Sequence, residues 1–152
     1  AFAADCEVTM NEDSIQLIKE VDSGCLMAIN SLHQMEEYEM PKEQNDMITR
    51  YIAKHDELQK EASRMLHNNN ETDKQPGMMV SAMSWLTTEM KLMLHENKSE
   101  ISKIIMNGCN MGIQSIREQM AKYKAASEEA VKLANKLIKL EEDMFSDAKE
   151  FI

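Results

Sequence analysis

A nine-residue pattern that occurs twice constrains the fold of this chain more than any other feature. Residues 24–32 read GCLMAINSL and residues 108–116 read GCNMGIQSI, so glycine, cysteine, methionine, isoleucine and serine recur in one order. Farther along, residues 50–58 align without gaps with residues 136–144, which places His55 opposite Glu141. At 152 residues the chain is expected to form a single domain. We therefore interpret it as two copies of one helical hairpin.

Apolar residues recur at steps of three and four in four long stretches, which is the period of one helix face. Pro41 and the Pro-Gly pair at 76–77 interrupt this period. A fifth stretch, rich in Met and Leu, is too short and too charged to span a bilayer. We predict long helices over residues 14–37, 41–67, 99–123 and 127–151, and an accessory helix over residues 77–95.

The connections between these helices predict the topology. Only a few residues join the two helices of each hairpin, which makes each pair antiparallel. About 30 residues separate the two hairpins, and the accessory helix lies within them; such a long crossover is typical of ferritin-like bundles. The fold expected for residues 12–152 is all-α, a ferritin-like four-helix bundle of two duplicated hairpins with a long helical crossover.

Charge and cysteine content narrow the partners and the compartment. The formal net charge of -10 argues against nucleic acid and against an anionic membrane surface. Three cysteines without a CxxC spacing fit reduced thiols and a cytoplasmic protein. Residues 1–11 are interpreted as a leader or an expression remnant. If residues 1–9 instead follow a cleaved signal peptide, the protein is secreted.

Two features of composition and spacing bear on packing. The chain contains 15 methionines and only 5% aromatic residues, which predicts a core rich in flexible thioether side chains. Gly108 and Gly112 stand four residues apart in the third long helix. Because glycine inside a helix costs about 1 kcal/mol relative to alanine, this pair predicts that a neighbouring backbone approaches closely.

The segments Met83-Ser84-Trp85-Leu86 and Met111-Gly112-Ile113, together with four helices and a helical crossover, carry a resemblance. The chain resembles an uncharacterised bacterial family of ferritin-like four-helix bundles. The resemblance covers nearly all of residues 12–152, and its motifs are packing motifs. It implies a fold and no particular activity.

A standard di-iron centre needs Glu-x-x-His motifs on two helices of such a bundle. The chain has none, since the residues three positions before its histidines, His33, His55, His67 and His95, are Asn30, Ile52, Arg64 and Leu92. This pattern argues against ferroxidase or oxygenase chemistry of that type. We therefore expect no catalytic residues and no enzymatic activity.

A weaker metal hypothesis comes from the repeat, which pairs Cys25 with Cys109 and His55 with Glu141. If all four point into the core at one height, their ligand types suit zinc, and copper or iron less specifically. The alternative is that both cysteines are small core residues, that His55 is a hydrogen-bonded core histidine, and that Glu141 lies at the edge of the apolar face. We favour this alternative, with no metal and no cofactor.

The function expected from these observations is that of a non-catalytic binding or structural bundle that self-associates. A homodimer through the accessory helix at residues 77–95 is the expected partner interaction, because an adaptable Met-bearing surface suits a second subunit. A metal-storage or metal-sensing protein with a non-standard core site is the alternative.

Overall fold

The structure is a computed structural model that describes residues 10–71, 84–93 and 97–152. Within these ranges all regular secondary structure is helical. The helices are α1 (Glu12–Met35), α2 (Lys42–Asn68), α4 (Thr88–Met93), α5 (Lys98–Lys122) and α6 (Glu128–Lys149). The four long helices begin and end within two residues of the ranges expected.

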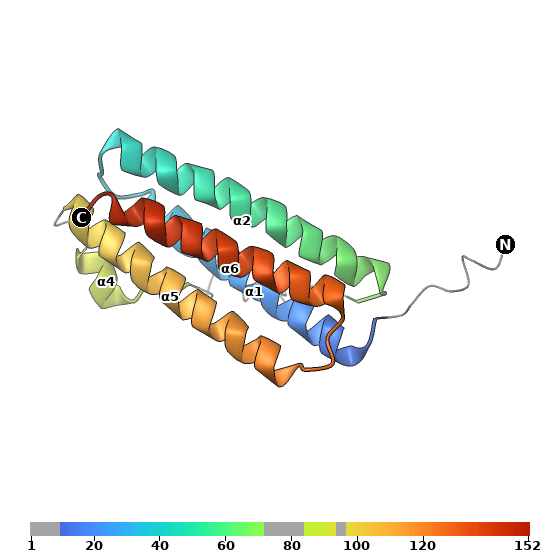
Figure 1. The fold of residues 1–152 in the computed structure, drawn as a ribbon. Helices are drawn as coiled ribbons and strands as arrows, with labels where there is room; N and C mark the ends of the chain where they lie inside the picture. The colour runs from blue at the N-terminus through green and yellow to red at the C-terminus, as the bar shows by residue number, and fades with distance from the viewer. Residues whose placement is uncertain (1–9, 72–83, 94–96) are drawn as a thin grey trace.

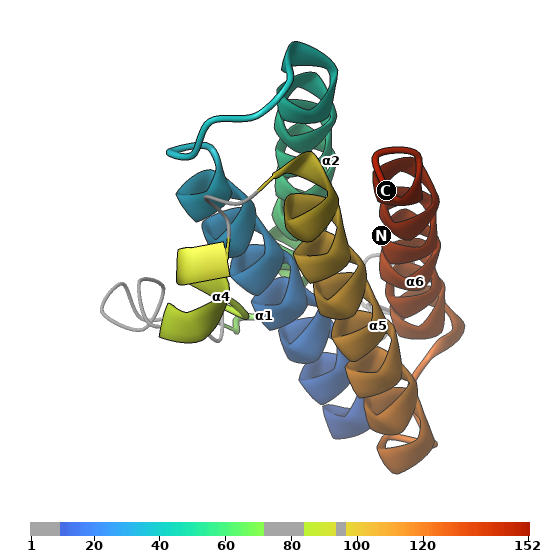
Figure 2. The same ribbon diagram turned by 90° about the vertical axis from the view of Figure 1, so that its left-hand side faces the viewer.

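The four long helices form one bundle (Figure 1). Helix α1 runs antiparallel to α2, and α5 runs antiparallel to α6, whereas α2 and α5 run in the same direction (Figure 1). Helix α1 packs against α2, α5 and α6, and α6 also packs against α2. Figure 2 shows α4 on the outside of the bundle, beside α1 and α5. No helix in the described ranges is long and apolar enough to cross a membrane.

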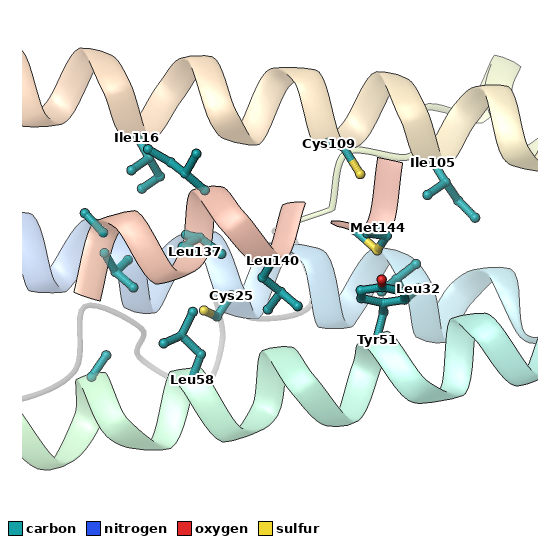
Figure 3. Packing of buried hydrophobic residues seen from close by; sticks show 14 of the residues in the cluster. Cys25, Leu32, Tyr51, Leu58, Ile105, Cys109, Ile116, Leu137, Leu140 and Met144 are labelled. Atoms are coloured by element: carbon teal, nitrogen blue, oxygen red, sulfur yellow. The ribbon is translucent and has the colours of Figure 1, made fainter. Parts of the chain in front are cut away.

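The core runs along the centre of the bundle (Figure 3). Branched aliphatic side chains make up most of it, and among the methionines that the structure describes only Met35, Met47 and Met144 are fully buried. Several other methionines pack against the core from its edge: Met10, Met40, Met65, Met90, Met106 and Met120. The interior is thus mainly aliphatic, and the expectation of a thioether-rich core is wrong for the described residues.

The accessory segment differs from the helix expected over residues 77–95. Residues 84–87 are not helical and α4 begins only at Thr88; residues 77–83 and 94–95 lie outside the described residues. Side chains explain the difference, because hydroxyl oxygens accept hydrogen bonds from backbone N–H groups in this segment. The Trp85 N–H donates to Ser31 Oγ (2.9 Å) and the Leu86 N–H to Ser84 Oγ (3.1 Å). Thr87 Oγ1 accepts from the Met90 N–H (3.1 Å) and starts the short helix.

Candidate functional site

A buried histidine and a buried glutamate meet in the centre of the bundle. His55 of α2 is 0% exposed and Glu141 of α6 is 4% exposed. The His55 Nε2 atom lies 2.7 Å from Glu141 Oε1. The other ring nitrogen, Nδ1, lies 2.7 Å from the backbone oxygen of Tyr51, one turn earlier in α2. Both nitrogens of the ring therefore have a hydrogen-bond partner.

These contacts limit which atoms of His55 and Glu141 can hold a proton. A carbonyl oxygen only accepts, so the Nδ1 atom of His55 must carry hydrogen. The contact between Nε2 and Glu141 Oε1 then holds one further proton, which belongs either to an imidazolium beside a carboxylate or to a carboxylic acid beside a neutral imidazole. In both arrangements the pair is electrically neutral, which is how a charged group is accommodated in an apolar core.

The two buried cysteines lie around the same glutamate. Burial, the negative charge of Glu141 and a hydrogen bond from the thiol to that carboxylate raise the pKa of Cys109. Burial and the charges of Glu141 and Asp22 raise the pKa of Cys25 well above 9.0. Both side chains are fully buried, and they lie well apart in the core (Figure 3). Both thiols are consequently protonated at neutral pH.

The structure thus brings His55 and Glu141 together and adds Cys109 to the pair through a hydrogen bond, while Cys25 lies apart from Cys109. Among the described residues, no group of three or more His, Cys, Asp or Glu side chains is placed to hold a metal ion. A metal would need thiolates and a free imidazole nitrogen. Here the thiols keep their protons and the imidazole nitrogens are engaged.

A cavity of about 260 Å³ opens beside the pair, between α1 and α5. Its floor is formed by Leu137 and Glu141 of α6, which are almost completely buried. Exposed residues of α5, Met111 and Ser115, lie at its outer side. The remaining lining residues come from α1, the accessory segment and α5: Glu20, Ser23, Gly24, Met27, Ala28, Trp85, Gly108, Gly112 and Ile116.

The two glycines of α5, Gly108 and Gly112, each have a different side chain as their close neighbour. A β-carbon at Gly108 would lie 2.6 Å from Cε2 of Trp85, so the indole ring occupies the space that a side chain would need. A β-carbon at Gly112 would lie 3.5 Å from Cδ and Oε2 of Glu141, which is ordinary contact. The close neighbours are thus the side chains of Trp85 and Glu141, and the expectation of a close backbone is wrong.

Serine 31 fixes the position of Trp85 at the cavity. Its hydroxyl accepts the Trp85 N–H, donates to the Met27 carbonyl oxygen (2.8 Å) and lies 3.1 Å from Ser84 Oγ. Leu86, which follows, is 8% exposed and belongs to the core. Trp85 is thereby held as one wall of the cavity. This role of Trp85 was not predicted from the sequence, although the hydroxyl-bearing residues around it, Ser84 and Thr87, are a signal against a continuous helix.

A second hollow is an open groove between α2 and α6. Lysines of both helices line it, but Lys136 pairs with Glu61 (2.8 Å) and Lys139 pairs with Asp143. The groove is therefore a surface of alternating charge. The α1–α5 cavity is the better candidate site, because it reaches the buried pair.

The described part of the chain is an all-helical bundle with a buried histidine–glutamate pair and a small side cavity. A crystal structure of a DUF305 fragment from Deinococcus radiodurans has a similar fold, with a TM-score of 0.65. The sequence identity is 12%, and the match covers 93% of this chain and 95% of that chain. At this identity the likeness shows the fold alone. Neither a known protein family nor a curated protein matches the chain.

Proposed function

We propose that the protein is a non-catalytic helical bundle that binds a small molecule in the cavity between α1 and α5. The main support for this proposal is the space beside Gly112. A glycine in a helix costs about 1 kcal/mol relative to alanine, yet a β-carbon here would meet Glu141 only at ordinary contact distance, 3.5 Å. Packing therefore does not require the glycine. Its effect is to leave Oε2 of Glu141 accessible from the cavity.

The state of the thiols supports a role without catalysis. The thiolate is the nucleophilic form of cysteine, and the pKa of both Cys25 and Cys109 is raised. The histidine that would activate a nucleophile is held between a carbonyl oxygen and Glu141. Binding is the activity that this arrangement supports.

The directions of the helices support a ferritin-like assignment within the all-helical class. Helices α2 and α5 run the same way and are separated by a long connection (Figure 1), which is the arrangement of bundles with one crossover.

Self-association through the accessory segment also remains part of the proposal. Leu92 and Met93 of α4 are 70% and 39% exposed. Light scattering of the wild-type chain and of Leu92→Asp tests it, with a dimeric mass expected only for the wild type.

The binding proposal is tested with benzene as an apolar probe. Benzene fits a cavity of about 150 Å³, and Trp85 is the single tryptophan of the chain, so its fluorescence reports on the cavity. The variant Ala28→Leu fills space from α1, and Ala53→Leu on the exposed side of α2 is the matched control. We expect benzene to change the fluorescence of the wild type and of Ala53→Leu. An equal response in Ala28→Leu would contradict the proposal.

A further inference from the structure

The wall of the α1–α5 cavity selects among the small molecules that fit it. Building on the proposed function, we infer that the ligand is a small organic cation, an alkylammonium with a compact apolar body. Three properties of the wall carry this inference: its charge, the orientation of the buried pair, and the side chains that surround the ligand's body.

The charge of the wall favours a cation over an anion. Glu20 and Glu141 both line the cavity, and none of the described residues that line it is Lys, Arg or His. The whole chain has a formal net charge of -10, so its field also attracts cations and repels anions. An anionic ligand would lose its hydration beside two carboxyl groups without gaining a basic partner from the described lining residues, which is unfavourable.

The buried pair presents its acidic end to the cavity. Glu141 lines the cavity, whereas His55 lies behind it, bonded to Oε1. The other oxygen, Oε2, faces the space above Gly112, where a β-carbon would come within 3.5 Å of it. An ammonium group in this space donates a charge-assisted hydrogen bond to Oε2, which is stronger than a bond between neutral groups.

The remaining walls suit a compact apolar body. Met27, Leu137 and Ile116 contribute apolar surface, and Trp85 supplies an aromatic ring held over Gly108. Tryptophan is the side chain whose ring attracts cations most strongly. Since a cavity of about 150 Å³ holds benzene, the volume of about 260 Å³ accommodates a six-membered ring with a head group.

Three probes that share one ring but differ in head group test this inference: cyclohexylammonium, cyclohexanol and cyclohexanecarboxylate. The full chain is titrated with each at constant ionic strength, and both Trp85 fluorescence and the unfolding temperature are measured. Gly112→Ala places a methyl group against Glu141, while Asn110→Ala is the matched helix control on an exposed position of α5.

We expect cyclohexylammonium to bind at least about tenfold more tightly than cyclohexanol, with the carboxylate weakest. Gly112→Ala should weaken ammonium binding by about tenfold, and Asn110→Ala should leave it unchanged. If the alcohol or the carboxylate binds as tightly as the ammonium, the cation inference is overturned while the ligand-binding cavity stands. If none of the probes changes the fluorescence or the unfolding temperature, the proposed function is overturned as well.

Discussion

His55 and Glu141 form a hydrogen-bonded pair across the bundle, with 2.7 Å between Nε2 and Oε1, although both side chains are buried. Glu141 also accepts a hydrogen bond from the Cys109 thiol and forms part of the cavity floor. The same carboxyl group thus bonds to buried side chains and also lines the cavity.

We predict that His55→Ala destabilises the fold by about 3–5 kcal/mol, because it leaves a buried carboxyl group without its partner. The chain contains a matched control in His33, which bonds to Glu36 at 2.9 Å with a side chain 57% exposed. His33→Ala should cost less than about 1 kcal/mol, as exposed pairs do. Urea unfolding of both variants measures the difference. Similar losses in the two variants would contradict the assigned role of the buried pair.

The two α5 glycines should respond oppositely to alanine. Gly108→Ala places a β-carbon 2.6 Å from the Trp85 ring, so we expect a loss of about 1–3 kcal/mol from overpacking and a shifted Trp85 emission. Gly112→Ala has room for its methyl group and should gain about 0.5–1 kcal/mol from helix propensity. Thermal unfolding with tryptophan emission measures both. A stabilised Gly108→Ala with unchanged emission would refute the packing of Trp85.

Alkaline pH should destabilise the fold through its buried thiols. The pKa of Cys25 and of Cys109 lies above the ordinary value of 9.0 in the folded chain. As pH rises through about 9, the unfolded chain loses these protons first and binds fewer protons than the native state, so the free energy of unfolding falls. Burial and Asp147 also raise the pKa of Tyr51, which adds to the fall at higher pH.

Urea unfolding between about pH 8 and pH 10 under reducing conditions measures this fall. The variant with Cys25→Ala and Cys109→Ala should lose less stability over that interval than the wild type. Tyr51→Phe is the companion variant for the phenol. Identical pH profiles in the wild type and the double cysteine variant would show that the thiols do not contribute.

The state of the same thiols leads to a prediction about zinc. Zinc binding would require two protonated thiols to lose their protons and the His55–Glu141 hydrogen bond to break. Protein purified without chelators should therefore contain far less than stoichiometric zinc, copper or iron by elemental analysis. Near-stoichiometric metal that disappears in both Cys25→Ser and His55→Ala would revive the four-residue metal site.

The sequence predicted the long helices, but it brought His55 and Glu141 together only in the metal hypothesis that we did not favour. The favoured alternative placed Glu141 at the edge of the apolar face, and this was wrong, because Glu141 is 4% exposed and bonds to His55. Helix positions follow from an apolar period that is local in the chain. The alignment of the two halves made His55 and Glu141 equivalent positions of the repeat, but it did not predict their hydrogen bond. Whether the two residues bond to each other or hold a metal depends on where both ring nitrogens point. One of them points at the Tyr51 carbonyl oxygen, which no side-chain pattern encodes.

The cavity was beyond sequence reasoning, because it depends on a contact between distant segments. Ser31 of α1 holds the backbone of Trp85, and Trp85 fills the space above Gly108. The apolar period of the accessory segment favoured a continuous helix, in which Trp85 would lack this contact. The small residues Gly24, Ala28 and Gly112 were visible in the sequence, but their common cavity appears only once the helices are packed.

The central claim, that the α1–α5 cavity binds small molecules, is tested most directly by mapping where benzene binds in solution. Two-dimensional NMR spectra of the 15N-labelled chain would be recorded with and without benzene. We predict that the largest shifts occur at the Trp85 indole N–H and at the amides of Gly24 and Gly112, which line the cavity. Shifts confined to the α2–α6 groove, around Leu58 and Leu140, or no shifts at all, would contradict the account.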